Sequence, residues 1–388
     1  MQNFEYDIAT KIFFGKGEIE KLPAEIKKYA DRVLLVYGGG SIKKIGVYQQ
    51  LTRLFEEHGI AYEELSGVEP NPRVASVNRG AALCREHDLQ AVVAVGGGST
   101  IDCSKVIAAA TFYEGDAWDL VIKKAPVTKV LPVFSVLTLS ATGSEMDAGA
   151  VISNLETHDK LAISHPDMRP KASVLDPTYT YSVNAYHTAA GTADIISHTL
   201  ENYFSVHKDF YLLDSMAEAI LKTCFRYGPI ACREPENYEA RANLMWASSL
   251  AINGLIRLGK FVPWGVHSME HELSAYFDIT HGVGLAILTP AWMRHVLCEE
   301  TVDQFAAYGK NVWGIDASLP KREIAEKAID RTQEFFTKEL KIPASLHEVG
   351  ITEDHLEVMA KKAATPALQG AFQPLSAKDV LEIYRACF

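Results

Sequence analysis

The chain has 388 residues, of which 48% are hydrophobic and 22% are charged. This length exceeds what one hydrophobic core normally supports, so we expect two domains. The net charge of −11 opposes nonspecific attraction to nucleic acid or to an anionic membrane surface. The first residues, MQNFEYDIAT, lack the apolar core of a signal peptide, and no apolar run approaches the about 18 residues of a membrane span. We therefore expect a cytoplasmic protein that binds neither nucleic acid nor membrane.

The cysteines are widely scattered in the sequence and form no C-x-x-C pair. They are Cys84, Cys103, Cys224, Cys232, Cys298 and Cys387. Such spacing indicates neither a zinc ribbon nor a disulfide framework. It is typical of buried free thiols in a reducing compartment.

Helix-like and strand-like segments alternate between residue 17 and about residue 175. The expected strands are 32–37, 62–65, 91–95 and 130–137, and the expected helices are 18–29, 47–58, 75–87 and 101–113. Strands that are apolar throughout, separated by helices, imply a parallel sheet covered on both faces. The N-terminal part is therefore predicted to be a Rossmann-like α/β domain.

The pattern becomes helical after Asp176-Pro177. The expected helices are 185–204, 210–225, 238–258, 266–276, 285–297, 301–308, 321–340, 353–362 and 377–386. No strand-like alternation competes with them. We expect an α/β domain over residues 1–180 and an all-α domain over residues 181–388.

Two of the expected strands run directly into triple glycines. The residues concerned are Gly38, Gly39, Gly40 and Ser41 in the first turn, and Gly96, Gly97, Gly98 and Ser99 in the second. Glycines at the carboxyl end of a strand let backbone N–H groups approach a phosphate, and Ser99 would open a helix whose N-terminus favours anions. Plain tight connections are the alternative, but two such turns in one sheet favour a dinucleotide site. Neither turn matches G-x-G-x-x-G, so the binding mode need not be the standard one.

The first turn also indicates which dinucleotide binds. NAD sites commonly place an acidic residue at this strand end to bind the ribose 2′-hydroxyl, and that carboxylate repels a 2′-phosphate. Here Gly38 occupies the position, and Lys43 and Lys44 follow. This favours NADP(H), with two solvated lysines as the plainer interpretation.

A row of small hydroxyl side chains follows the strand expected at 130–137. Thr138, Thr142 and Ser144 could cap a helix, or they could contact the diphosphate and the nicotinamide ribose. Asp102 and Lys160 are further candidates for ribose contacts.

Five residues in the helical part have the side chains and spacing of a metal site. His267 and His271 are four residues apart on one helix, so their rings share a face, and Asp194 and His198 have the same spacing on another. His281 precedes Gly282 and Gly284, which would let backbone approach a bound group. A single such residue is usually solvated or hydrogen-bonded in a core. One carboxylate with several imidazoles, however, suits Fe(II) or Zn(II).

Together, these segments resemble the iron-containing, group III alcohol dehydrogenases, most closely their NADPH-dependent butanol dehydrogenase or aldehyde reductase branch. The resemblance runs nearly end to end, through FGKGEIEKL, YGGGSIKKIGV, VEPNPR, AVGGGSTIDCSK, LTLSATGSEMDAGAVIS, VLDPTYTYS, EPENYEARANLMWA and WGVHSMEHELSAYFDITHG. It implies a dehydroquinate synthase-like architecture. It also implies the metal ligands Asp194, His198, His267 and His281, with His271 as a non-ligand histidine beside them.

The resemblance implies reversible hydride transfer between NADPH and small to medium aliphatic aldehydes, of the butanal and butanol kind. The metal, bound in part by His267, would act as Lewis acid on the carbonyl oxygen, and His271 is a candidate proton relay or a support for His267. A homodimer is expected from the family and from an edge strand near residues 6–13. A lyase of the dehydroquinate synthase kind is the second hypothesis, although few basic residues other than Arg257 and Lys260 are available for an acidic substrate. A non-catalytic metal or nucleotide sensor is the third.

Overall fold

The computed structural model describes residues 3–206 and 210–388, which divide into two compact units. The sheet unit comprises Asp7–Val183 and Pro235–Ser249. The helical unit comprises Asn184–Glu234 and Leu250–Phe388, together with the N-terminal residues up to Tyr6. The division after Val183 lies near the expected boundary at residue 180, but the segment 235–249, which we had assigned to the helical domain, lies with the sheet. Met245 explains this placement, because it packs in one buried cluster with Ala94 and Leu137 of the sheet.

All strands of the main sheet run parallel. The strands are β1 (Lys11–Phe14), β2 (Arg32–Tyr37), β3 (Ala61–Leu65), β4 (Ala91–Gly96), β5 (Val133–Leu137) and β8 (Ala172–Leu175), in the spatial order β1-β8-β5-β4-β2-β3. The glycine turns after β2 and β4 therefore follow neighbouring strands at the same edge of the sheet. The predicted α/β class with a parallel sheet is confirmed.

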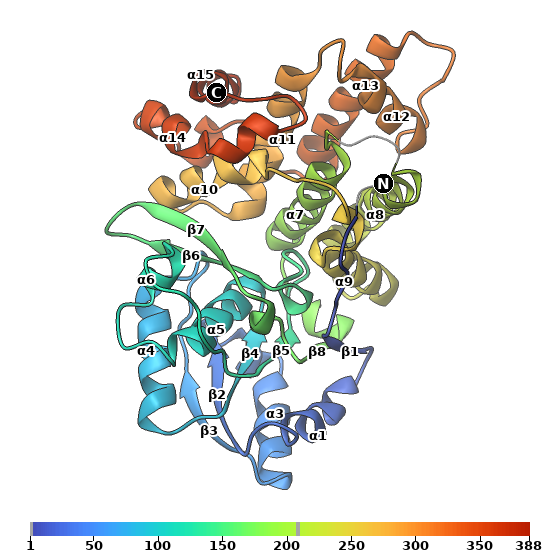
Figure 1. Cartoon of the computed structure of the whole chain (residues 1–388). Coiled ribbons are helices and arrows are strands. Elements are labelled where there is room, and N and C mark those ends of the chain that lie inside the picture. The colour runs from blue at the N-terminus through green and yellow to red at the C-terminus, as the bar shows by residue number, and fades with distance from the viewer. Residues whose placement is uncertain (1–2, 207–209) are drawn as a thin grey trace. The chain divides into compact units, whose positions relative to one another are not determined.

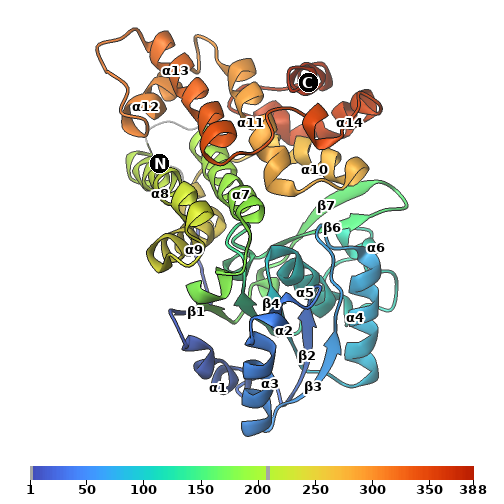
Figure 2. The same cartoon turned by 180° about the vertical axis from the view of Figure 1, so that it is seen from behind.

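Two hydrophobic cores lie on the two faces of this sheet. Successive residues of β2 alternate between them: Val33 and Leu35 belong to one core, and Leu34 and Val36 to the other. This alternation explains why the strand is apolar throughout. The helices of the sheet unit are α1 (Leu22–Ile26), α2 (Ser41–Lys44), α3 (Val47–Glu57), α4 (Val74–Glu86), α5 (Gly98–Ala110) and α6 (Trp118–Val121). Helices α1 and α3 cover one face, and α4 and α5 cover the other (Figure 2).

An antiparallel hairpin, which we did not anticipate from the sequence, follows the loop after β5. Its strands are β6 (Gly149–Asn154) and β7 (Asp159–Ser164). The side chain of Lys105 on α5 is fully buried and donates to Asp147 Oδ1 at 2.5 Å and to the carbonyl of Gly149 at 2.7 Å. The hairpin is therefore joined to the helix that follows the second glycine turn.

The remaining long helices belong mainly to the helical unit. They are α7 (Ala185–Tyr203), α8 (Tyr211–Arg233), α10 (Gly265–Phe277), α11 (His281–Val296), α12 (Val302–Asn311), α13 (Lys321–Glu334), α14 (Leu356–Ala363) and α15 (Ala377–Arg385). Helix α9 (Tyr238–Ile252) lies mostly in the sheet unit. Helix α7 packs against α8 and α11, and α10 packs against α11 and α14. Among the described residues, no helix combines the length and apolar character needed to cross a membrane.

Candidate active site

Helix α7 presents three ionisable side chains on one face. Asp194, His198 and Glu201 follow one another at spacings of four and three residues, which place them one above the other along a helix. All three are buried. Because a buried ionisable group needs a partner, this face requires compensating groups from other elements.

Helices α10 and α11 bring the remaining histidines to this face. His267 and His271 lie on α10, and His281 is the first residue of α11, which starts four residues before the expected residue 285. A Cβ atom at Gly282 would lie 1.9 Å from the carbonyl oxygen of Ala190, so glycine allows the start of α11 to lie directly against α7. The backbone of α7 therefore crowds Gly282.

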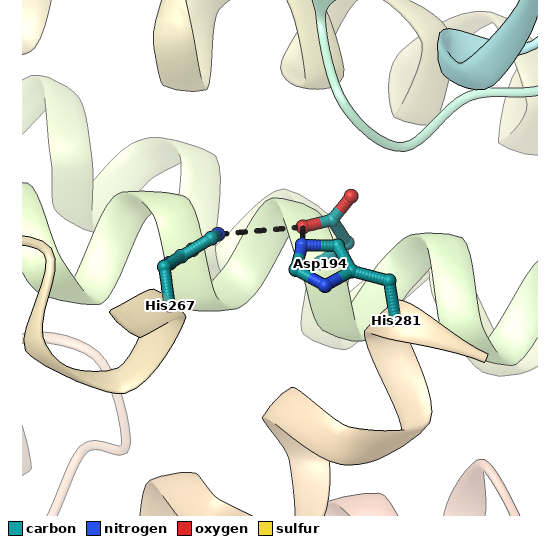
Figure 3. A group of neighbouring side chains, drawn as sticks. All are labelled: Asp194, His267 and His281. Atoms are coloured by element: carbon teal, nitrogen blue, oxygen red, sulfur yellow. Dashed lines mark ion pairs between the residues drawn. The ribbon is translucent and has the colours of Figure 1, made fainter. Parts of the chain in front are cut away.

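Asp194, His267 and His281 form the centre of the site, as Figure 3 shows. Nε2 of His267 and Nε2 of His281 each lie 3.7 Å from Oδ1 of Asp194. One potential ligand atom from each of the three residues lies within 4.8 Å of the others. The structure thus gathers one carboxylate oxygen and two imidazole nitrogens around one point.

His198 lies beside this group. Its Nδ1 is 3.5 Å from Oδ1 of Asp194, and its ring stacks on that of His267 with the centroids 4.5 Å apart. The ring of His271 is farther out, with its centroid 6.3 Å from that of His267 and 5.7 Å from that of His281. The four expected ligands are therefore close together, and His271 is at their margin.

Three polar atoms in this group are buried without a hydrogen-bond partner among the described residues. They are Oδ1 of Asp194, Nδ1 of His198 and Nε2 of His267. Buried polar atoms are rarely left unpaired, because each loses its bonds to water. A cation among them would satisfy all three, so the donor set fits a divalent metal.

Two buried glutamates, which were not predicted from the sequence, contact Nδ1 of His267 and of His281, on the side of each ring that faces away from Asp194. Nδ1 of His267 donates to Oε2 of Glu201, which also accepts from the backbone N–H of His267 at 3.2 Å. Nδ1 of His281 donates to Oε2 of Glu270. Glu201 could have been suggested by its helical spacing from Asp194 and His198. No local pattern links Glu270 to His281.

The charges in the site shift the pKa values of its residues in different directions. Burial lowers the pKa of His198 to about 3, so its ring is neutral. Burial opposes ionisation of Asp194, but the three nearby histidines outweigh it and hold the pKa of this carboxyl well below its usual range. Burial also disfavours the charged form of His267, but Glu201 and Asp194 raise its pKa to about 9. The carboxylates therefore make this buried site favourable for positive charge.

The two glycine turns lie in the sheet unit and differ in their surroundings. A Cβ atom at Gly96 would lie 2.4 Å from Oγ1 of Thr100, and one at Gly98 would lie 2.2 Å from Oγ1 of Thr142. Glycine is thus required there by the protein itself. Gly39 faces open space, and Gly40 has a positive φ of 94°. Helix α5 begins at Gly98, one residue before Ser99, so its N-terminus directly follows the second turn.

The hydroxyl row after β5 has partners within the protein. Ser144 donates to Oδ1 of Asp102 at 2.5 Å, and the backbone N–H of Val151 donates to Oδ2 of Asp102 at 2.8 Å. Thr142 accepts from the backbone N–H of Ser144 at 3.2 Å, which is a turn-capping contact. Thr138 follows β5 directly, and its backbone N–H donates to the carbonyl of Gly96. The carboxylate of Asp102 therefore joins α5 to the loop after β5 and to the hairpin.

Lys160, the other expected ribose contact, lies on β7. It is buried and pairs in register with Ser153 of β6. The sequence did not predict the hairpin, so it also did not predict that Lys160 lies on a strand. Lys105 of α5 donates to the carbonyl of Gly149 in the same hairpin, so the hairpin connects Lys160 to α5.

Lys43, expected to favour NADP(H), belongs to a small cluster with Glu64, Tyr37 and Tyr48. Its Nζ lies 3.8 Å from Oε2 of Glu64 and sits over both tyrosine rings, 5.0 and 4.3 Å from their centroids. Both tyrosine hydroxyls donate to Glu64. Burial raises the pKa of Glu64, but these hydrogen bonds outweigh it and lower the pKa overall. An ionised carboxylate therefore stands next to the lysine, a feature not evident in the sequence.

Comparison with known proteins covers both units of the chain. Residues 9–177 match the family described as iron-containing alcohol dehydrogenase, and residues 188–388 match the C-terminal region of the Fe-containing alcohol dehydrogenase family. NADH-dependent butanol dehydrogenase A of Clostridium acetobutylicum is 58% identical over 390 residues, covering 100% of both chains. NADPH-dependent aldehyde reductase YqhD of Escherichia coli is 40% identical over 369 residues, covering 93% of both chains.

Solved structures agree with these matches. The crystal structure of NADH-dependent butanol dehydrogenase A from Thermotoga maritima superposes with a TM-score of 0.94 at 37% identity, covering 100% of this chain and 99% of that one. The E. coli YqhD structure also gives a TM-score of 0.94, at 36% identity over 100% of this chain and 99% of that one. The expected architecture and the resemblance described from the sequence are confirmed. This chain belongs to the iron-containing alcohol dehydrogenase family.

Proposed function

We propose that the protein is a metal-dependent alcohol dehydrogenase that interconverts small to medium aliphatic aldehydes and alcohols, of the butanal and butanol kind. The observation that carries the proposal is the group formed by Asp194, His198, His267 and His281, of which the first three are buried and His281 is partly exposed. The names of the butanol dehydrogenases and the aldehyde reductase among its relatives support this substrate class.

We assign Asp194, His198, His267 and His281 as the ligands of an Fe(II) or Zn(II) ion. The unpaired buried atoms of Asp194, His198 and His267 support the assignment, and the family name supports iron. A divalent ion held there supplies Lewis acidity toward a carbonyl or alcohol oxygen. The protein's part is to keep the rings oriented and to limit the access of water, as the burial of Asp194, His198 and His267 allows.

We assign His271 the transfer of a proton between solvent and the substrate oxygen. Its partial exposure supports this role, because its ring lies at the margin of the site while His198 and His267 are buried. Support of His267 is the alternative role. A proton-transfer role predicts that H271A lowers turnover at neutral pH more than it lowers metal content.

We propose NADPH as the coenzyme, bound at the glycine turns after β2 and β4. The proposed contacts are Gly38, Gly39, Ser41, Gly96, Gly97, Gly98, Ser99, Asp102, Thr138, Thr142, Ser144 and Lys160. Gly38 brings no carboxylate to the 2′-phosphate, and Lys43 stands five residues further on. NADH is the second candidate, favoured by the names of several relatives and by the carboxylate of Glu64 beside Lys43.

The decisive experiment measures coenzyme oxidation with butanal, with NADPH and NADH compared, together with the metal content of protein made in cells. We expect turnover that requires metal, and H267A should lose both the metal and at least about 100-fold in turnover while still binding coenzyme. A H267A variant that kept full activity after exhaustive chelation would overturn the proposal. Phosphate release from a phosphorylated sugar acid, without net oxidation of the coenzyme, would favour a lyase instead.

We also propose a homodimer in the cytoplasm. The edge position of β1 in the sheet supports a role in association, because edge strands can pair with another chain. Light scattering on the purified protein tests this, and a monomer at micromolar concentration would contradict it.

A further inference from the structure

Glu270 on α10 is a fully buried carboxylate that lies among the side chains of the proposed metal site. Oε2 accepts from Nδ1 of His281, and Oε1 accepts from the hydroxyl of Ser274. Potential ligand atoms of Glu270, His271 and His281 also lie within 4.8 Å of one another. Both oxygens of Glu270 thus have hydrogen-bond donors, one of which is a proposed metal ligand.

The packing of α11 leaves room for this glutamate. A Cβ atom at Gly284 would lie 2.9 Å from Cγ of Glu270 and 3.2 Å from its Oε1. Gly284 lies three residues after His281, so the missing side chain and the histidine are on the same face of α11. The side chain of Glu270 therefore occupies the space between α10 and α11 that the glycine leaves open.

Stability alone does not account for a carboxylate at this position. Burying a carboxylate costs several kcal/mol, and replacing a buried ion pair by apolar residues of similar volume is often neutral or stabilising. The hydroxyl of Ser274 is a neutral donor, and one neutral hydrogen bond does not offset the cost of burying the charge of Glu270. The imidazole of His281 is the other donor and is itself a proposed metal ligand, so the function of Glu270 is to be sought through His281.

The second carboxylate, Glu201, has the same relation to His267. Each of these two histidines turns Nδ1 to a buried glutamate and Nε2 to Oδ1 of Asp194, at 3.7 Å in both cases. A metal ligand must be the neutral imidazole, which has one N–H and one lone pair. Because a carboxylate can only accept, the N–H of that neutral form is on Nδ1 and its lone pair is on Nε2. Both lone pairs consequently point to the centre of the site.

We propose that Glu270 is a positioning residue that fixes the tautomer and the ring orientation of His281, so that Nε2 is held ready to bind the metal. This inference rests on the proposed function, since it assumes that His281 is a ligand. Glu201 does the same for His267, and it also accepts from the backbone N–H of Val266 at 2.9 Å, so its replacement would disturb the start of α10 as well.

The test compares E270A and E270Q with wild type by the dissociation constant for Zn(II), measured in competition with a chromophoric chelator, and by the absorption spectrum of the Co(II)-loaded protein. Loss of an outer partner of a metal ligand typically costs 10- to 100-fold in metal affinity, which is the loss we expect for E270A. E270Q keeps an acceptor for Nδ1 but loses the charge. We expect a smaller loss of about 3- to 10-fold and a Co(II) spectrum close to that of wild type.

E218A is the matched control. Glu218 is also buried in the helical unit, but it accepts from the hydroxyl of Tyr203 at 2.9 Å and from Nδ2 of Asn311 at 2.8 Å. We expect E218A to lower the melting temperature without changing the Zn(II) affinity. A purely structural role of Glu270 would give E270A the same result as E218A.

The outcomes separate this inference from the proposed function. If wild type binds no Zn(II) or Fe(II), both are wrong. If wild type binds metal but E270A and E270Q bind within twofold of it, only the role of Glu270 is wrong. Should E270A not fold, E270Q alone decides: a loss of threefold or more with a wild-type circular dichroism spectrum supports the role, and an unchanged affinity overturns it.

Discussion

At the scale of single residues, the contacts of Glu64 bear on the proposed coenzyme preference, because this carboxylate lies beside Lys43. It lies on β3, next to the strand that leads into the first glycine turn, and it accepts hydrogen bonds from Tyr37 and Tyr48. Its carboxylate is also 3.8 Å from the ammonium of Lys43. The lysine is therefore partly neutralised before any 2′-phosphate arrives.

Replacement of Glu64 by glutamine should shift coenzyme preference toward NADPH. The amide can still accept from a tyrosine, but it no longer attracts Lys43, whose charge becomes available to the phosphate. We expect the ratio of kcat/KM for NADPH over NADH to rise about 3- to 10-fold, the size of one partly exposed ion pair. Steady-state kinetics with both coenzymes measure it. Glu63, which is half-exposed and 3.7 Å from His87, provides the control variant E63Q, and an equal change in both variants would contradict the prediction.

Glu145 is a second informative residue, because it is fully buried and only one of its oxygens has a partner. Oε1 accepts from the hydroxyl of Ser249, which fastens the end of α9 to the loop after β5. Oε2 has no partner among the described residues. Burial raises the pKa of Glu145 to about 7, although Ser249 and Lys105 act in the opposite direction.

The stability of the protein should fall with rising pH because of Glu145. Its folded pKa lies above the unfolded value of 4.5, so the folded state holds the proton more tightly. This contribution is complete below about pH 4.5 and is lost as the pH rises through 7. Relative to E145Q, wild type should lose about 3 kcal/mol of unfolding free energy between pH 5 and 8. Urea unfolding across this range tests it, and parallel pH profiles would refute it.

At the scale of elements, the site depends on how closely the start of α11 approaches α7. Gly282 permits this approach because a side chain there would overlap the backbone of Ala190. The approach places His281 next to Asp194, although the two residues come from different helices. The geometry of the proposed metal site is therefore coupled to the packing of two helices.

Substitution of Gly282 by alanine should damage both the fold and the site. The added methyl group cannot be accommodated by a rotamer change, since the nearest atoms belong to a helix backbone. We expect a destabilisation of at least about 1–3 kcal/mol, the usual cost of overpacking, and a loss of most of the bound metal. Thermal unfolding and elemental analysis check this. If this variant had the melting temperature and the metal content of wild type, α11 could shift without loss of stability, and the prediction would be wrong.

At the scale of the whole molecule, the proposed metal joins three helices of one unit only. Its ligands come from α7, α10 and α11, all within the helical unit, whereas the glycine turns belong to the sheet unit. A ligand that binds only the folded state stabilises it according to its concentration and affinity. Metal removal should therefore act mainly on one of the two units.

Chelation should lower the melting temperature and loosen the helical unit selectively. At a free metal concentration of 100 to 1,000 times Kd, the stabilisation lost is about 3–4 kcal/mol. Amide hydrogen exchange should become faster in α7, α10 and α11, while β2 and β4 keep their protection. Equal changes in both units, or no change in the three helices, would contradict the assignment of the ligands.

The amino-acid sequence alone determined the parallel sheet, the helical second part and the family. Strand β2 was predicted with its observed limits, because both of its faces are buried and the apolar run therefore ends where the strand ends. Helical spacing placed Asp194 with His198 on one face, because that relation depends only on residues four apart. The hairpin β6–β7 was missed, since its short strands are only partly buried and lack a continuous apolar run.

Only the tertiary structure decided which side chains complete the site. Glu201 and His267 are 66 residues apart, and no local pattern records their contact. Glu270 contacts His281 because α10 and α11 pack face to face and Gly284 leaves space between them. The partner of Lys43 came likewise from the neighbouring strand β3. Periodicity reports how each segment is buried, whereas hydrogen bonds between segments depend on how those segments pack.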